Sequence, residues 1–163
     1  MIALFAAGSL FCAGLREAVA QADKPSAPFA SWKGARQPAK GELELFQSKR
    51  TLPPFSLCRV ALAKDLSAVE CELPVDSAQA AESQLASLIK DAGSCLGETW
   101  ERKHSPMEHE VMVQRGLLGM ASWDRRALNV MLYAQGPAAK DRFGFPLERV
   151  EKGAVLVLTV TAE

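Results

Sequence analysis

Two neighbouring stretches of alternating apolar residues constrain the fold of this chain more than any other feature. They are FSLCRVAL (55–62) and SAVECELPV (67–75), and Lys64 and Asp65 lie between them. Alternation with a period of two is typical of strands that bury one face, and a short polar link between two such strands favours a tight turn. The sequence therefore predicts an antiparallel hairpin whose turn is centred on Lys64 and Asp65.

A turn at this point determines which side chains share a face. One face of the hairpin is then apolar, with Cys58 opposite Cys71, and consists of Cys58, Val60, Leu62, Val69, Cys71 and Leu73. The other face carries Arg59, Glu70 and Glu72. We expect this face to be solvated, like that of Glu42 and Glu44, because charged side chains are rarely buried.

Residues 76–96 (DSAQAAESQLASLIKDAGSCL) predict a helix. Apolar side chains recur at helical spacing, at Leu85, Leu88, Ile89, Ala92 and Leu96. Asp76 or Ser77 is suited to cap the first turn, and Gly93 or Gly97 is suited to end the helix.

Three later stretches are rich in strand-forming residues: EVMVQRGLLGMASW (110–123), RRALNVMLYAQ (125–135) and GAVLVLTVTA (153–162). A turn at Asp124 and Arg125 would join the first two, with a bulge at Gly116 or Gly119. We therefore expect an α+β domain. Its antiparallel sheet would have about five strands, in the order β-β-α-β-β-β, with one main helix packed across a face.

Residues 1–22 have the pattern of an export signal. The apolar run IALFAAGSLFCAGL is short for a permanent membrane span, and Ala20-Gln21-Ala22 fits a signal peptidase site. We predict a signal peptide over 1–22, which leaves a periplasmic or secreted protein without a permanent membrane span. The alternative is that this segment forms a buried N-terminal helix of the fold.

Residues 23–41 contain three prolines and two glycines without a hydrophobic period. This composition predicts a flexible lead-in, rich in Pro, Ala and Lys, before a single domain over 42–163. Its four cations and Trp32 suit an anionic lipid or an acidic partner. The simpler interpretation is a solvated tether whose Trp32 packs onto the domain.

The predicted mature chain keeps three of the four cysteines, and an oxidising compartment favours one disulfide among them. Cys58 and Cys71 face each other across the hairpin, whereas Cys95 lies far along the helix from both. We therefore expect a Cys58–Cys71 bridge and a buried Cys95 thiol. The alternatives are a bridge from Cys95 to either strand cysteine or to a second chain.

Both histidines lie in ERKHSPMEHE (101–110). In an extended chain His109 points away from the neighbouring glutamates, and Pro106 separates it from His104. Because a zinc site needs three or four converging ligands, we expect no metal and no cofactor here. A thiolate–imidazole pair with Cys95 is also disfavoured, since the negative end of the helix dipole opposes a thiolate.

The residues best suited to bind a partner are Trp123, Arg125, Arg126 and Tyr133. The first three lie at the predicted hairpin tip, and tryptophan and arginine are enriched in interface hot spots. The loop DRFGFPLERV (141–150) adds two phenylalanines. The alternative is that these aromatic side chains complete the core.

The chain is formally neutral, which argues against a nucleic-acid partner. The export signal and the absence of a converging catalytic set favour a non-catalytic envelope protein of the inhibitor, immunity or accessory type, which binds another protein or a small ligand. One alternative is a small envelope hydrolase with a Cys/His or carboxylate site. Another is a structural subunit that pairs through an exposed edge strand within residues 153–162.

Overall fold

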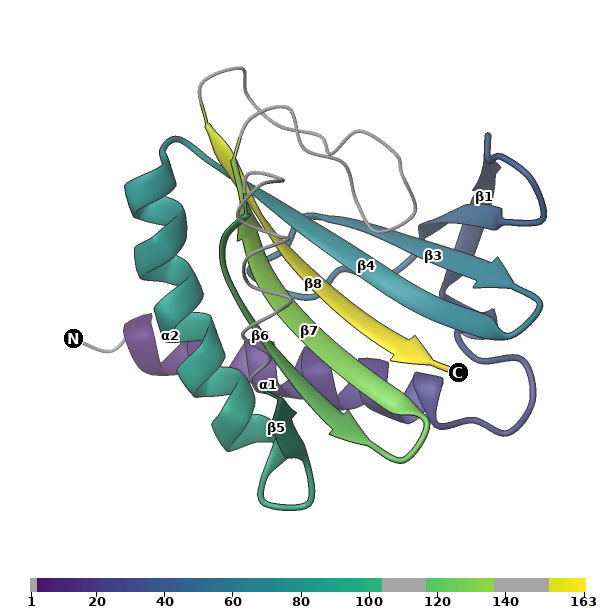
Figure 1. The fold of residues 1–163 in the computed structure, drawn as a ribbon, viewed down its shortest axis with the longest axis horizontal. Helices are drawn as coiled ribbons and strands as arrows, with labels where there is room; N and C mark the ends of the chain where they lie inside the picture. The colour runs from purple at the N-terminus through teal and green to yellow at the C-terminus, as the bar shows by residue number, and fades with distance from the viewer. Residues whose placement is uncertain (1–2, 104–116, 137–152) are drawn as a thin grey trace.

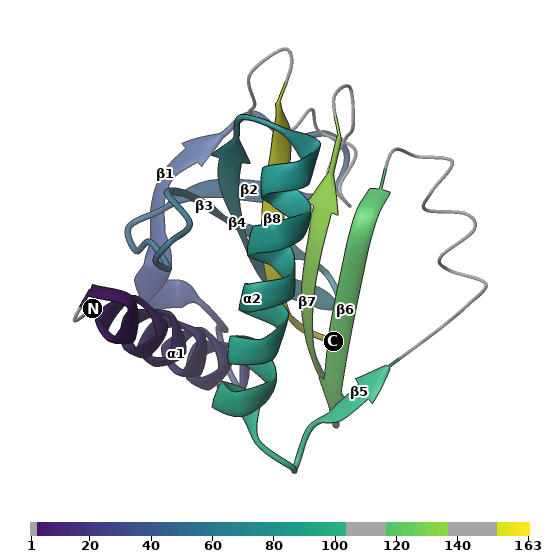
Figure 2. The same ribbon diagram turned by 90° about the vertical axis from the view of Figure 1, so that its left-hand side faces the viewer.

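The computed structural model of the protein describes residues 3–103, 117–136 and 153–163. Within these residues, eight strands form one antiparallel sheet in the order β1-β2-β3-β4-β8-β7-β6-β5. The strands are β1 (Lys33–Gln37), β2 (Glu44–Ser48), β3 (Leu57–Ala63), β4 (Leu66–Val75), β5 (Glu101–Lys103), β6 (Leu117–Arg125), β7 (Leu128–Gln135) and β8 (Ala154–Ala162). Two helices, α1 (Ala3–Ala22) and α2 (Ala78–Leu96), pack against the same face of the sheet (Figures 1 and 2).

The predicted class, an α+β domain with an antiparallel sheet, is confirmed, but the predicted numbers of strands and helices were wrong. The described sheet has eight strands rather than about five, and two helices rather than one pack on it. Strands β1, β2 and β5 have the sequences KGARQ, ELFQS and ERK. They are short and mostly polar, so they show no alternation by which a half-buried strand could be recognised.

The β3–β4 hairpin has the predicted turn and register. Ala63 pairs with Leu66 across Lys64 and Asp65, and Cys58 lies opposite Cys71. The apolar face of the hairpin joins the main core under the two helices. The Cα atoms of the two cysteines are 4.0 Å apart and their sulfur atoms are bonded, which is the pairing that the register favoured.

Strand β8 is the centre of the sheet. It pairs with β4 on one side and with β7 on the other, along nearly its whole length. Its residues from Ala154 to Thr161 are buried, because β8 lies between two strands and both of its faces are covered. The hypothesis that this strand is an exposed edge for assembly is therefore wrong.

Helix α2 begins and ends at residues that the sequence indicated. The Ser77 hydroxyl accepts a hydrogen bond from the amide of Ala80 at 3.1 Å, and Gly97 caps the other end with a φ of 77°. A left-handed residue after a helix suits glycine, which has no Cβ to clash. Leu85, Leu88 and Ala92 from the predicted apolar stripe are buried on the sheet.

Helix α1 is part of the core. Phe11, Leu15 and Ala18 have exposed fractions of 1%, 0% and 0%, while Arg16 and Glu17 between them are exposed. This spacing is that of an amphipathic helix with one buried stripe. The structure thus has the arrangement of the alternative interpretation, a buried N-terminal helix. Cleavage after Ala22 stays an untested prediction, and it competes with this arrangement because it would remove the helix.

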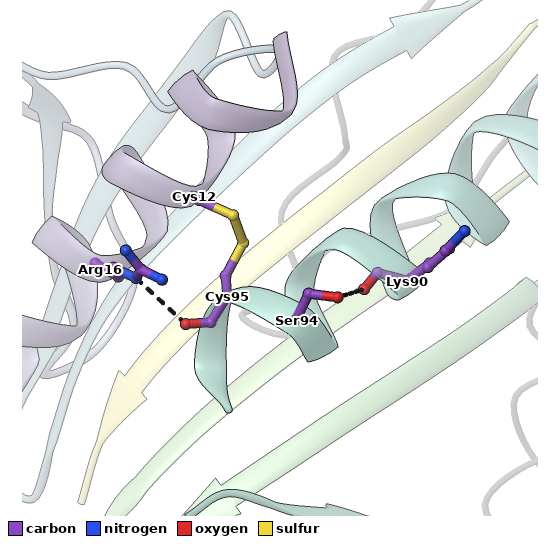
Figure 3. Close-up of a disulfide and its surroundings, with 5 residues drawn as sticks. All are labelled: Cys12, Arg16, Lys90, Ser94 and Cys95. Atoms are coloured by element: carbon purple, nitrogen blue, oxygen red, sulfur yellow. Dashed lines mark hydrogen bonds between the residues drawn. A yellow bond between two sulfur atoms is a disulfide. The ribbon is translucent and has the colours of Figure 1, made fainter. Parts of the chain in front are cut away.

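A disulfide joins the two helices. Cys12 of α1 is bonded to Cys95 of α2, and the Arg16 Nε donates a hydrogen bond to the Cys95 carbonyl at 3.3 Å (Figure 3). The prediction of a Cys95 thiol, free or bonded to a strand cysteine, is therefore wrong. It rested on the removal of Cys12 with the signal peptide, which left Cys95 without its partner.

Residues 23–41 are more ordered than the predicted flexible lead-in. They contain a 3-10 turn, η1 (Ala30–Trp32), and the whole of β1. Phe29 and Trp32 are buried, and their ring centroids lie 5.9 Å apart in an edge-to-face arrangement. Trp32 does pack onto the domain, and the strand after it was missed because pairing with β2, rather than an apolar face, holds it in place.

Strands β6 and β7 form the predicted second hairpin, but its turn lies two residues later than expected. Arg125 pairs with Leu128, so the turn residues are Arg126 and Ala127. Arg126 has a φ of 56°, the left-handed conformation that tight two-residue turns require. The register shifts between Leu117 and Gly119, as a bulge does. Gly116, the other predicted bulge position, lies outside the described residues.

Candidate binding site at the end of the sheet

Two hairpin turns, the end of β8 and the segment that follows α1 meet at one end of the sheet. Between them lies a hollow of about 510 Å³, which we call the sheet-end hollow. Its lining residues are Ala22, Asp23, Lys24, Pro25, Pro28, Lys64, Asp65, Leu66, Ser67, Arg126, Ala127, Leu128, Ala162 and Glu163. Segments far apart in the sequence thus form one surface, because the antiparallel strands place both turns at the same end.

The sheet-end hollow carries six charged side chains, three of each sign: Lys24, Lys64, Arg126, Asp23, Asp65 and Glu163. Some of these charges are already engaged. Asp23 Oδ2 lies 3.7 Å from an Arg125 guanidinium nitrogen, and the Lys24 Nζ donates a hydrogen bond to Gln21 Oε1 at 2.8 Å.

Lys64 and Arg126 differ from these engaged groups. Both are exposed, and no hydrogen bond or ion pair to any described residue engages either of them. They stand on two different hairpin turns that line the same hollow. Two cations in this position can receive an acidic group from outside the molecule without giving up an internal contact.

Contacts around the β6–β7 turn hold the backbone of Arg126 in position. The amide of Glu163 donates to the carbonyl of Ala127 at 3.0 Å, which ties the turn to the end of β8. Next to it, the Arg125 guanidinium lies 4.8 Å from the centre of the Trp100 ring. The turn is therefore anchored on both sides, so Arg126 is presented from a fixed backbone.

The four residues predicted to bind a partner do not form one surface. Trp123 has an exposed fraction of 3% and belongs to the main core, and Tyr133 has one of 6% and lies in a smaller cluster on the other face. Arg125 is partly exposed beside the hollow, and Arg126 alone of the four lines it. The prediction that Trp123 and Tyr133 lie on a binding surface is wrong. Because the turn lies two residues later than predicted, Trp123 stands within β6, opposite Val130, where it packs into the core.

The face of the sheet opposite the helices holds buried charges that the sequence placed in solvent. Glu70 and Glu72 have exposed fractions of 1% and 2%. A guanidinium nitrogen of Arg59 lies 3.2 Å from Glu70 Oε1 and also contacts Glu72 Oε1. The predicted solvated face is wrong at this point, since alternation shows on which face a side chain lies but not whether that face is covered.

A smaller pocket borders this ion cluster. It has a volume of about 190 Å³ and is lined by Gln37, Gln47, Ser48, Thr51, Ser56, Leu57, Cys58, Arg59 and Glu72. Because Arg59 engages both carboxylates, the cluster holds strands β3 and β4 together as a cross-strand ion pair. We therefore interpret it as structural rather than catalytic.

The cysteine form of the hydrolase hypothesis has no nucleophile. All four cysteines are in disulfides, Cys12–Cys95 and Cys58–Cys71. His104 and His109 lie outside the described residues, as does the loop 141–150 with its two phenylalanines. Among the residues with defined positions, no group of three or more His, Cys, Asp or Glu side chains is arranged to hold a metal ion.

Sequence reasoning missed Lys64 as a site residue, although it placed this residue correctly in a turn. The missing information was that the β3–β4 and β6–β7 turns lie close together, which depends on β8 entering the sheet between β4 and β7. The resulting class is an α+β domain with an antiparallel sheet and a charged hollow at one end of that sheet. Comparison with protein-family models, curated proteins and solved structures finds no match for this chain.

Proposed function

We propose that this protein is a non-catalytic binding protein of an oxidising compartment, the bacterial periplasm or the external medium. In this proposal it holds a charged group of a partner protein in the sheet-end hollow, as an inhibitor, immunity protein or accessory factor does. The observation that carries the proposal is the pair of cations, Lys64 and Arg126, which line one hollow and are engaged by no described residue.

The disulfides support the compartment. Both pairs of cysteines are bonded, and stable disulfides form and persist where the environment is oxidising. None of the helices in the described part of the chain is long and apolar enough to cross a membrane.

The mixed charge of the hollow supports a protein surface as the partner. A carboxylate of the partner would face Lys64 and Arg126, while Asp65 and Glu163 would repel a uniformly anionic surface. Glu163 and Asp65 can in turn receive a cation of the partner. Contacts of both signs are typical of protein surfaces and select against wrong partners.

The test is affinity capture of the tagged protein from the envelope fraction, repeated with two charge-reversed variants. Arg126→Glu changes the hollow, and Lys90→Glu makes the same kind of change on the exposed side of α2. We expect wild type and Lys90→Glu to recover the same partner in near-equal amount. Arg126→Glu should weaken its binding at least about tenfold, the effect of about 1.4 kcal/mol. Equal recovery with both variants would show that the hollow is not the binding site.

A further inference from the structure

The outermost described strand of the sheet, β1, is open on one side. It pairs with β2 and has no other neighbour among the described strands, and Ala35 and Arg36 are exposed. The amide of Lys49 donates to the carbonyl of Trp32 at 2.8 Å, which flanks the Lys33–Ser48 pair. A pair flanked in this way is a non-hydrogen-bonded pair of an antiparallel ladder, so the amide and carbonyl of Lys33 point away from β2.

This edge of the molecule is basic although the whole chain is formally neutral. Residues 33–50 contain five cations and two carboxylates, so this segment has a net charge of +3. The cations are Lys33, Arg36, Lys40, Lys49 and Arg50, and the carboxylates are Glu42 and Glu44. The Arg36 guanidinium lies 3.0 Å from Glu44 Oε1, and both side chains remain largely exposed. The open strand therefore lies in a region of positive charge.

A bulge brings two of these cations onto one side of the sheet. Lys33 and Arg36 are three residues apart, but their partners Ser48 and Phe46 are two apart, because the register shifts between them. Ser48 and Phe46 are two residues apart on β2, so their side chains share a face. Paired residues lie on the same face of a sheet, so Lys33 and Arg36 share that face as well. The Lys33 Nζ accordingly lies 4.9 Å from the centre of the Phe46 ring.

Exposed edge strands usually invite pairing with any other strand, and cations and bulges on an edge suppress this. The cations of β1 would repel the same strand of a second copy. They would attract a strand that carries carboxylates at every second position, since such side chains also lie on one face. The charge of the edge thus disfavours pairing with a basic strand and favours pairing with an acidic one.

We propose that β1 receives an extended acidic segment of a partner protein as an added strand, with acidic side chains facing Lys33 and Arg36. This recognition combines main-chain hydrogen bonds with alternate side-chain contacts. It uses a surface separate from the sheet-end hollow, so either site can fail without the other.

The test uses a fluorescent peptide in which Glu alternates with Thr, and the same peptide N-methylated at alternate residues to remove backbone donors. We expect the first peptide to bind and to slow the hydrogen exchange of β1 amides. The N-methylated peptide should bind at least about tenfold more weakly. Equal binding of both peptides, or unchanged exchange in β1, would overturn strand addition.

Two variants with the same change in charge show where the peptide binds. Lys33→Gln with Arg36→Gln should lose at least about tenfold in affinity, whereas Lys90→Gln with Lys103→Gln, at two exposed lysines outside both β1 and the sheet-end hollow, should bind as wild type does. Loss of binding in the second variant instead would overturn the assignment to β1. Binding of phosphatidylglycerol vesicles through Lys33 and Arg36, with no exchange protection from the peptide, would identify a lipid surface and likewise overturn the proposal.

Discussion

At the scale of single residues, Trp123 has a structural role. Its indole is buried between the sheet and α2, where the Nε1 atom lies 4.0 Å from the point that a Cβ on Gly93 would occupy. Removal of a large core side chain costs lost burial and leaves a cavity. The side chain therefore contributes to folding rather than to a binding surface.

We predict that Trp123→Ala lowers the free energy of unfolding by about 3–5 kcal/mol. Arg125→Ala is the neighbouring control, because it removes a partly exposed side chain that contacts the Trp100 ring, and should cost about 1 kcal/mol or less. Denaturant unfolding of both variants measures the difference. A Trp123→Ala protein as stable as wild type would contradict the buried position.

Arg59 is the second residue on which stability depends. Its side chain is 19% exposed, and it contacts two carboxylates that are almost fully buried. Removal of one member of a buried ion pair leaves the other charge buried without that partner. The free energy lost in this way exceeds the stability that the intact pair contributes.

Arg59→Met should therefore lower the free energy of unfolding by about 3–5 kcal/mol. The matched control is Arg36→Met, whose ion pair with Glu44 has side chains that are 68% and 47% exposed. Such surface pairs contribute about 0–1 kcal/mol. Equal losses in the two variants, measured by denaturant unfolding, would contradict a buried cluster at Arg59.

Arg59 and Trp123 also show what the sequence could and could not predict about the candidate site residues. Alternation correctly placed Arg59 and Glu70 on the face opposite the cysteines, because the side-chain period of a strand is two. Whether that face is covered depends on segments distant in sequence, so the burial of Glu70 was not predictable. For Trp123, an error of two residues in the turn was enough to turn a core residue into a predicted surface residue.

At the scale of elements, the two disulfides constrain very different lengths of chain. Cys12 and Cys95 are separated by 83 residues, and Cys58 and Cys71 by 13. In the chain-entropy model, a disulfide stabilises the fold more when it closes a longer loop of the unfolded chain. The bridge between the helices should therefore contribute more than the bridge within the hairpin.

We predict that replacing Cys12 and Cys95 with Ala lowers the free energy of unfolding by about 4.5 kcal/mol, against about 3 kcal/mol for Cys58 and Cys71. Each double variant keeps the other bridge, and denaturant unfolding compares them. Limited proteolysis should cut the first variant within α1 before any other described element. An opposite order of stability would contradict α1 as a permanently attached helix.

Elements differ in how far the sequence predicts them. The β3–β4 hairpin and α2 follow from local patterns, alternation in the first and capped helical periodicity in the second. Strand β1 depends on its partner β2, and α1 has a composition that suits either an export signal or a buried helix. Local patterns do not distinguish those two outcomes.

At the scale of the whole molecule, α1 completes the core. Its buried side chains lie in one cluster with residues from the sheet, α2 and the segment around Phe55. The aromatic rings of Phe11 and Phe55 have centroids 6.4 Å apart, and Leu52 packs beside Gly14. A protein without α1 would expose this apolar surface and leave Cys95 without its partner.

The attachment of α1 to the core through the Cys12–Cys95 bridge is tested directly by one measurement. The protein isolated from its own cells is digested without reduction and mapped by mass spectrometry. We predict a peptide pair joined through Cys12 and Cys95, together with a pair joined through Cys58 and Cys71. A protein whose first residue is Asp23, with an unpaired or differently paired Cys95, would contradict the account.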